Sequence, residues 1–312
     1  IVGARPNFMK VAALHRAFEQ RDDMQSRILH TGQHYDEKMS DVFFRQLGLP
    51  EPHVYLGVGS GSHADQTARI MIGFEQALAE EKPDVVVVVG DVNSTLACSL
   101  VCAKMGVPVV HVEAGLRSFD WTMPEEINRV VTDRLCELLF VSEPSGLKHL
   151  AAEGVPPEKV HFVGNVMIDS LIHFLEKARG LDERERLGLD AGRYVLVTMH
   201  RPSNVDDPSS AGRVVDGLRR VAKELPIVLP LHPRGRELLN SQGLSDVDGL
   251  VVTDPIGYLE FMALVAGASL VLTDSGGIQE ETTVLGIPCL TLRDNTERPI
   301  TVTMGTNRLV GN

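Results

Sequence analysis

The segment from Ser269 to Leu292 combines the residue types of an anion-binding turn. An apolar run is followed by Ser275, Gly276 and Gly277, which open a segment of helical character. A helix that starts on glycines presents free backbone N–H groups and the positive end of its dipole, so the expected ligand is an anion, most plausibly a diphosphate. Glu281 follows early in the helix, where a carboxylate can accept hydrogen bonds from a ribose hydroxyl pair. The alternative is an ordinary turn with Ser275 as N-cap and Glu281 on a solvated face.

Further polar residues follow apolar runs elsewhere in the chain. Arg5, Asp91 and Glu113 come directly after three such runs in the first half, and His200 follows one in the second half. The carboxyl ends of parallel strands meet at one edge of a sheet, where α/β proteins bind ligands, so these side chains are expected to converge. For Asp91 the alternative is an N-cap of the next helix. His111 lies within an apolar run and is expected to be a hydrogen-bonded core histidine.

Glu125 allows two interpretations. It stands in a helical segment after an apolar run, where it can serve as an acid or base. It also completes the capping-box pattern Thr122-x-x-Glu125 and lies four residues before Arg129, which is the spacing of a helical ion pair. The second interpretation makes Glu125 purely structural.

The elements that must position these residues alternate between strand and helix. Val85 to Val89 is a run of five valines, typical of a parallel strand that is buried on both faces. Strands are expected at 27–31, 85–89, 108–112, 138–142, 160–163, 194–199, 226–231, 250–252, 269–273 and 287–292, and first-half helices at 7–20, 35–47, 63–81, 93–105, 125–136 and 144–152.

This alternation predicts an α/β protein with two doubly wound Rossmann-like domains that face a central cleft. A polar stretch from Lys177 to Arg193 separates the two series of strands. We place the domain boundary so that residues 1–165 form the N-terminal domain and residues 166–312 the C-terminal domain, with a connecting helix that runs to about residue 180.

Composition excludes several classes of protein. At 312 residues the chain fits two domains, and its formal net charge of -12, without a basic stripe, argues against a nucleic-acid or anionic-membrane partner. The four cysteines have no CxxC spacing and fall in apolar segments, which predicts reduced core thiols in a cytoplasmic protein. No apolar run approaches the roughly 20 residues that span a bilayer.

Several catalytic motifs are missing from the sequence. A glycine-rich stretch from Gly57 to Gly61 lacks GxGxxG spacing, so a nicotinamide site has weak support. The sequence contains no GxxxxGK[ST] motif of a P-loop, no HExxH metal motif and no GxSxG nucleophile motif. We therefore expect neither a metal nor an organic cofactor.

Nine motifs, in order along the whole chain, resemble the non-hydrolysing UDP-N-acetylglucosamine 2-epimerase family. They are GARPNFMK, TGQHYD, VVVGDVNSTLA, HVEAGLRS, MPEEINR, VGNVMIDSL, MHRPSNVD, LTDSGGIQEE and TERP. The resemblance implies a glycosyltransferase B-type fold with a UDP-sugar in the interdomain cleft, no metal or nicotinamide, and a homodimer. It also implies interconversion of UDP-GlcNAc and UDP-ManNAc for surface polysaccharide synthesis.

The same resemblance implies a role for each motif residue. The acid/base carboxylates are Asp91, Glu113 and Glu125. Arg5 and Lys10 lie near them on the first domain. The diphosphate is held by His200, which is also catalytic, and by the glycine turn of Ser275, Gly276 and Gly277. Glu281 binds the ribose, and Arg129 and Arg298 complete the polar substrate site.

The reaction explains why such a site is needed. The C2 proton of GlcNAc has no adjacent carbonyl, so its removal must accompany departure of UDP from C1, which gives a 2-acetamidoglucal. Protonation of the other face of C2 and return of UDP then give the epimer. The carboxylates transfer protons, and cationic or N–H groups stabilise the departing UDP.

Three alternatives remain at the level of sequence. A hydrolysing epimerase would release ManNAc and UDP from the same glycal, and a glycosyltransferase of this fold would need an acceptor channel. A non-catalytic nucleotide-sugar sensor would not need three carboxylates at strand ends.

Overall fold

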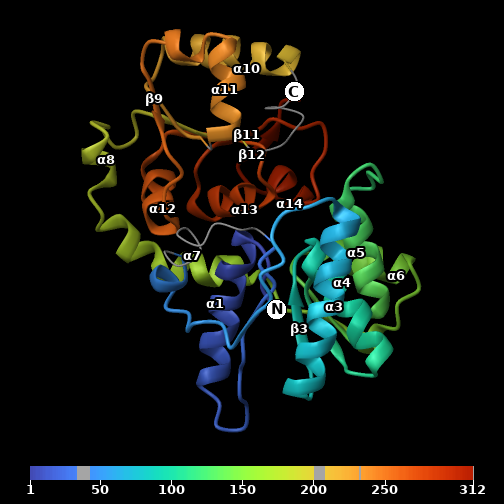
Figure 1. Ribbon diagram of the computed structural model, residues 1–312. Coiled ribbons are helices and arrows are strands. Elements are labelled where there is room, and N and C mark those ends of the chain that lie inside the picture. Colours follow the sequence, from blue (N-terminus) through green and yellow to red (C-terminus); the bar gives the residue numbers. More distant parts are fainter. Residues whose placement is uncertain (34–42, 200–207, 232, 312) are drawn as a thin grey trace. The chain divides into compact units, whose positions relative to one another are not determined.

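The computed structural model describes residues 1–33, 43–199, 208–231 and 233–311 (Figure 1). The chain divides into two compact units, Ile1–Ser170 and Leu171–Asn312. The division falls within helix α7 (Val166–Arg179), which was expected as the connecting helix. The boundary predicted between residues 165 and 166 coincides with the start of this helix and stays a prediction.

The first unit is built on parallel strands. A four-stranded sheet has the order β3-β4-β5-β6, formed by Val86–Val89, Val109–Ala114, Leu138–Val141 and Val160–Phe162. A two-stranded sheet pairs β1 (Leu29–His30) with β2 (Val54–Tyr55), and Val2 bridges to His30 beside it. The helices are α1 (Arg5–Glu19), α3 (His63–Glu81), α4 (Asn93–Met105), α5 (Pro124–Leu135) and α6 (Pro144–Ala152).

The core of this unit lies between the four-stranded sheet and its helices. Val86 and Val88 of the valine run pack in one cluster with Ile70 of α3 and Cys98 of α4. All six residues of β4 are buried, as expected for a central parallel strand. The sheet therefore holds the carboxyl ends of β3 and β4 side by side.

The second unit has one six-stranded parallel sheet with the order β12-β11-β10-β7-β8-β9. Its strands are β7 (Val195–Thr198), β8 (Ile227–Pro230), β9 (Leu250–Thr253), β10 (Leu270–Thr273), β11 (Cys289–Thr291) and β12 (Asn307–Leu309). Its helices are α8 (Glu183–Arg186), α10 (Pro208–Val221), α11 (Pro233–Ser241), α12 (Tyr258–Gly267), α13 (Gly276–Leu285) and α14 (Pro299–Thr303).

Alternate residues of the central strand β7 enter two different clusters. Val195 and Val197 pack in one cluster, and Leu196 packs in the other with Tyr194. Successive side chains of a strand point to opposite faces, so both faces of this sheet are covered. This is the doubly wound arrangement that the sequence predicts for the second half.

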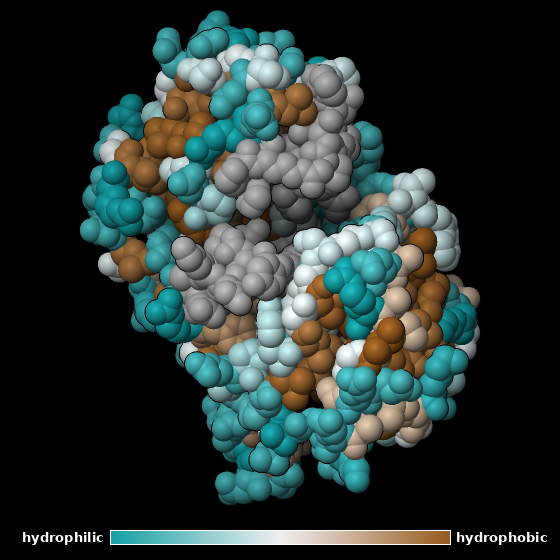
Figure 2. Space-filling model, in the orientation of Figure 1, coloured by the Kyte–Doolittle hydropathy of each residue, from teal (hydrophilic) through white to brown (hydrophobic). Residues whose placement is uncertain are grey.

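Hydrophobic residues form separate patches among hydrophilic ones on the face that Figure 2 shows. Exposed apolar side chains of the first unit include Ile72, Phe119, Trp121 and Phe162. None of the helices in the described ranges is both long and apolar enough to cross a membrane.

Candidate functional site

Glu113 occupies an unusual backbone position at the end of β4. Its φ is +74°, in the left-handed region that disfavours a side chain, and the pairing of β4 with β5 shifts register between Val112 and Ala114. Glu113 is therefore the extra residue of a β-bulge, a device that redirects a side chain beside functional sites. A non-glycine residue in this region costs about 1–3 kcal/mol, so the surrounding contacts must hold it there.

Lys10 of α1 forms a buried ion pair with the Glu113 carboxylate. The side chain of Asn7 fixes the start of this helix: its Oδ1 accepts the N–H groups of Gly3 and Ala4 at 3.1 and 3.0 Å, and its Nδ2 donates to the carbonyl of Val89 at 3.1 Å. Lys10 lies three residues further along the helix and so reaches the edge where β3 and β4 end. A Cβ added to Gly90 would come within 3.0 Å of Lys10 Nζ, so glycine leaves room for the lysine.

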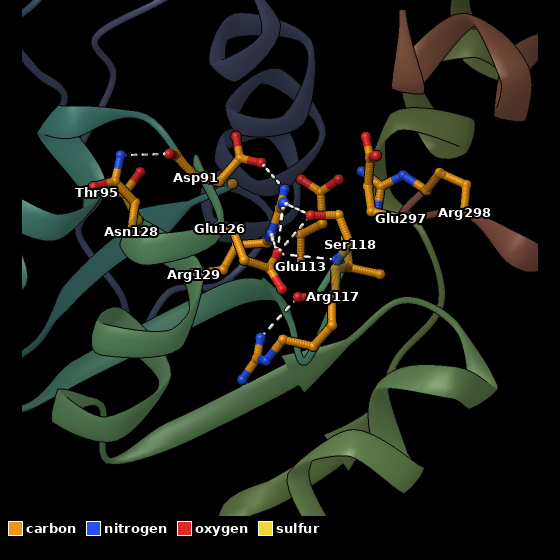
Figure 3. A network of polar contacts seen from close by, with 12 residues as sticks. Asp91, Thr95, Glu113, Arg117, Ser118, Glu126, Asn128, Arg129, Glu297 and Arg298 are labelled. Atoms are coloured by element: carbon orange, nitrogen blue, oxygen red, sulfur yellow. Dashed lines mark hydrogen bonds and ion pairs between the residues drawn. The ribbon is translucent and has the colours of Figure 1, made fainter. Parts of the chain in front are cut away.

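Asp91 follows Gly90, and its carboxylate is more exposed to solvent than that of Glu113. Its side chain is 34% exposed and forms an ion pair with Arg129 of α5. Val92, not Asp91, is the N-cap of α4, so the N-cap alternative for Asp91 is wrong. Asn128 Nδ2 donates to the Asp91 carbonyl at 2.8 Å and fixes the backbone here (Figure 3).

Arg129 is 2% exposed and connects two carboxylates. Its Nε and Nη2 donate to Glu126 Oε2 at 3.0 and 2.8 Å, and its Nη1 contacts Asp91. Figure 3 shows the guanidinium between these carboxylates. The sequence predicts Arg129 as a substrate-binding residue, whereas this geometry favours a role in holding Asp91.

Sequence reasoning missed Glu126. The carboxylate is 1% exposed and accepts the N–H groups of Ser118 and Phe119 at 3.0 and 2.8 Å, which anchors the loop after β4. Burial would raise the pKa of Glu126, but the Ser118 N–H and the Arg129 guanidinium outweigh burial and hold the pKa below its usual range. The i,i+3 spacing from Glu126 to Arg129 was the available signal.

The structural interpretation of Glu125 is wrong. Helix α5 has Met123 as its N-cap with no side-chain cap, and the Thr122 hydroxyl donates to Asp120 Oδ1 at 2.6 Å. Arg129 pairs with Glu126 and Asp91 instead of Glu125. Within the described part of the chain, the half-buried Glu125 carboxylate has no hydrogen bond or ion pair, so it is available to a ligand.

His111 and the cysteines are core residues, as predicted. His111 is fully buried and hydrogen-bonded through both ring nitrogens, to Asp133 at 2.6 Å and to the Gly90 carbonyl at 2.8 Å. The cysteines are all buried and free: Cys98, Cys102, Cys136 and Cys289. Burial raises the pKa of the Cys98 thiol and that of the other three, which keeps them protonated.

The second unit carries the glycine turn where it was expected. Ser275 is the N-cap of α13, and Gly276 and Gly277 are its first residues. The Ser275 side chain makes no capping bond, so the N–H groups of the first turn are not satisfied by it. A Cβ added to Gly276 would lie 2.4 Å from Glu297 Oε1, so a side chain does not fit there without displacing Glu297.

Glu281 is a buried carboxyl on the inner side of α13. It is 2% exposed, and the Tyr258 hydroxyl of α12 donates to it at 3.4 Å. Burial, with a further contribution from the nearby Glu280 charge, raises the pKa of Glu281 to about 7, although the Tyr258 hydrogen bond opposes this rise. The alternative of a solvated surface residue is wrong.

Arg298 lies beside the same helix. It is 6% exposed and pairs with Glu280 at 3.2 Å, while Arg293 pairs with Glu297 at 2.7 Å. Basic side chains therefore stand close to the end of α13 that carries the glycines. His200 lies outside the described residues, and for Arg5 only its place at the start of α1 is described.

No cluster of three or more His, Cys, Asp and Glu side chains in the described ranges is arranged to hold a metal ion. The expectation of a reaction without metal or organic cofactor comes from the missing sequence motifs and the family resemblance, and it stays a prediction.

The two units, each with a parallel sheet and polar residues at its strand ends, place the protein in the glycosyltransferase B-like fold class. The structure of Acinetobacter baumannii MurG shares this fold with a TM-score of 0.53 at 12% identity, over 99% of this chain and 84% of that one. The family model for UDP-N-acetylglucosamine 2-epimerase matches residues 16–312. The chain belongs to this family, and the predicted fold class and the resemblance are confirmed.

Several relatives align along the whole chain. The UDP-N-acetylglucosamine 2-epimerase of Methanocaldococcus jannaschii is 43% identical, with 100% of this chain and 87% of the relative covered. The crystal structure of that organism's enzyme with UDP-GlcNAc and UDP has a TM-score of 0.91 at 42% identity, over 99% of this chain and 87% of that one. The UDP-2,3-diacetamido-2,3-dideoxy-D-glucuronate 2-epimerase of Pseudomonas aeruginosa is 42% identical, with the same coverage of 100% and 87%.

Proposed function

We propose that this protein interconverts UDP-GlcNAc and UDP-ManNAc by inverting C2 of the sugar. The observation that supports this most is the pair of carboxylates at adjacent strand ends, in a chain of the epimerase family. Glu113 is buried against Lys10, whereas Asp91 is partly open and held by Arg129. Inversion needs proton transfer on both faces of one carbon, and two carboxylates in different surroundings suit that task.

The proposed reaction begins with elimination. A carboxylate takes the C2 proton, the bond between C1 and the β-phosphate oxygen breaks, and its electron pair leaves with UDP. The C2–H pair forms the C1–C2 double bond of the glycal. Addition reverses these changes: a carboxylic acid gives a proton to the opposite face of C2, and the UDP oxygen re-forms the bond to C1.

The described residues divide between these steps. Asp91, Glu113 and Glu125 transfer protons, and Lys10 compensates the charge of Glu113. The N–H groups of Gly276 and Gly277 stabilise the departing diphosphate. The remaining assignments follow the family resemblance. Ser275 and His200 help to hold the diphosphate, and Glu281 binds the ribose. Arg5 lies near the carboxylates on the first domain, and Arg298 completes the polar substrate site. Arg129 acts through Asp91.

The test is conversion of UDP-GlcNAc followed by proton NMR in EDTA-treated buffer without added NAD. We expect a mixture of UDP-GlcNAc and UDP-ManNAc that is the same from either direction, with free ManNAc a minor product. Stoichiometric release of ManNAc and UDP would instead support the hydrolysing epimerase. Consumption only after addition of a sugar acceptor would support the glycosyltransferase.

A second substrate is favoured by one comparison. The Pseudomonas relative named for UDP-2,3-diacetamido-2,3-dideoxy-D-glucuronate is as similar to this chain as the relative named for UDP-GlcNAc. The two sugars differ at C3 and C6 and carry the same acetamido group at the reacting C2. A comparison of kcat/KM for the two sugars shows which is the substrate. We expect a preference of at least about 100-fold for UDP-GlcNAc. A preference for the diacetamido sugar would make that sugar the substrate instead.

We also propose a homodimer that works in the cytoplasm. Both proposals rest on the family resemblance, with the free buried cysteines consistent with a reducing compartment. Sedimentation equilibrium tests the first: a dimer has about twice the chain mass of 34.1 kDa, and a mass equal to one chain would contradict it. Fractionation of the source cells tests the second.

A further inference from the structure

A buried chain of hydrogen bonds connects the backbone of Gly90, next to Asp91, with the backbone of Gly115, two residues after Glu113. Its centre is the pair of His111 on β4 and Asp133 on α5, whose side chains are both 0% exposed. His111 Nδ1 lies 2.6 Å from Asp133 Oδ1, and Nε2 lies 2.8 Å from the carbonyl oxygen of Gly90. The Gly90 carbonyl only accepts hydrogen bonds, so Nε2 donates to it and Nδ1 faces the Asp133 carboxylate.

Asp133 extends the chain of hydrogen bonds on its other side. Its Oδ2 accepts the backbone N–H of Gly115 at 3.1 Å and the Arg117 guanidinium at 2.8 Å. Arg117 in turn donates two hydrogen bonds to Glu153, at 2.8 and 2.9 Å. Burial would raise the pKa of Asp133, but the hydrogen bond from His111 and the Arg117 charge outweigh burial and keep the pKa below its usual range.

The two ends of this chain of hydrogen bonds lie at glycines beside the two carboxylates. Gly90 directly precedes Asp91, and Gly115 is two residues after Glu113. Gly90, Glu113 and Gly115 all have positive φ, at +69°, +74° and +79°. Glu113 is not a glycine, so it keeps this conformation only when its surroundings specify it, and here a single buried side-chain pair binds both segments.

We propose that His111 and Asp133 are positioning residues of the C2 epimerisation. They hold the backbone at Gly90 and Gly115 and thereby set the placement of the Asp91 and Glu113 carboxylates relative to each other. Proton removal on one face of C2 and delivery on the other depend on that placement. This inference rests on the proposed function.

A purely structural pair would stabilise the unit without affecting the balance of proton transfers. A readout that separates the two roles is the ratio of deuterium at C2 of recovered substrate to deuterium at C2 of product, measured in D2O. The ratio depends on whether the intermediate is protonated on its original face or on the opposite face. Loss of folded protein changes both quantities equally and leaves their ratio constant.

The experiment compares His111→Gln and Asp133→Asn with Leu150→Ala. Leu150 is 0% exposed in the core of the same unit, and its apolar side chain forms no hydrogen bond, so its truncation serves as the control for loss of stability. At a temperature where all variants are folded, we expect the first two to lower kcat about 10- to 100-fold, with KM changed less than about threefold. We expect the deuterium ratio to change at least about threefold, and Leu150→Ala to keep the wild-type ratio.

The results separate this inference from the proposed function. A wild-type protein without turnover contradicts the proposed function and the inference together. An active wild-type protein whose two variants keep its kcat and its deuterium ratio, with only a lower Tm, overturns the inference alone. If both variants fail to fold, Arg117→Lys decides, because it retains a cation beside Asp133: a changed ratio supports the inference, and an unchanged one overturns it.

Discussion

At the scale of single residues, neighbouring acids in this site have different tasks. Glu125 is half-buried and has no polar partner within the described ranges, whereas Glu126 is buried and binds two backbone N–H groups and Arg129. The sequence alone does not distinguish them, because both begin the same helix. The difference arises from the direction in which each side chain leaves α5.

Exchange of each acid for its amide tests this division. Glu126→Gln leaves Arg129 with one buried carboxylate fewer, so we expect a loss of about 3 kcal/mol in the free energy of unfolding. Glu125→Gln leaves stability within about 0.5 kcal/mol and lowers kcat about 100-fold. Urea unfolding and initial rates measure both. A Glu125→Gln protein that lost stability but kept its kcat would return Glu125 to a structural role.

The Lys10–Glu113 pair is expected to act as one unit. Lys10→Met leaves a buried carboxylate without its cation, and Glu113→Gln removes the charge itself, so each change is expected to lower kcat about 100-fold or more. The double variant is expected to be no worse than the weaker single variant, because both changes disable the same step. Losses of rate that multiply in the double variant would show that the two residues act separately.

At the scale of elements, the sequence predicted the strands better than the features at their ends. The valine run became β3, and an apolar run around residue 110 became β4. That strand extends beyond the predicted residue 112 to Ala114, and the bulge at Glu113 was not predicted. Strand β12 was also missed, because Asn307 and Arg308 do not match an apolar pattern. A bulge depends on pairing with a neighbouring strand, which local periodicity does not contain.

We propose that helix α13 binds UDP through its glycine N-terminus. Gly276→Ala adds a methyl group 2.4 Å from Glu297 Oε1, on the end of the helix that the diphosphate must approach. We expect UDP affinity to fall at least about 10-fold by calorimetry, with little change in Tm. Gly217→Ala is the matched control, since a Cβ there meets nothing within 4 Å. Equal affinities of the two variants would argue against the glycine turn as the diphosphate site.

Packing of α13 against α12 gives stability a pH dependence through Glu281. Its pKa of about 7, raised mainly by burial and further by the Glu280 charge, exceeds the ordinary value of 4.5. Between these values the folded protein binds a proton that the unfolded chain lacks, so stability falls as pH rises through this window. From pH 5 to pH 8 the loss is on the order of 2–3 kcal/mol.

Glu281→Gln removes this dependence, because the amide stays neutral. We therefore expect the stability of the wild type, relative to the variant, to fall by that amount from pH 5 to pH 8 in urea unfolding. Parallel pH profiles of wild type and variant would show that Glu281 does not titrate in this range.

At the scale of the whole molecule, the residues that we propose for the chemistry are divided between the two units. The first carries Lys10, Asp91, Glu113 and Glu125, and the second carries the glycine turn and Glu281. The alternation of strands and helices was enough to predict the α/β fold class, and the order of motifs along the chain was enough to predict the family. The contacts of each side chain depend on packing. The motif MPEEINR identified Arg129, but no sequence pattern predicted its burial between Asp91 and Glu126.

The central claim is that these carboxylates exchange the C2 proton while UDP leaves and returns. The most direct measurement is incubation with UDP-GlcNAc in D2O, followed by NMR at C2. The account predicts deuterium at C2 in UDP-ManNAc, no deuterium elsewhere in the sugar, and loss of this incorporation in Glu113→Gln. Conversion to UDP-ManNAc with the original C2 proton retained would contradict it.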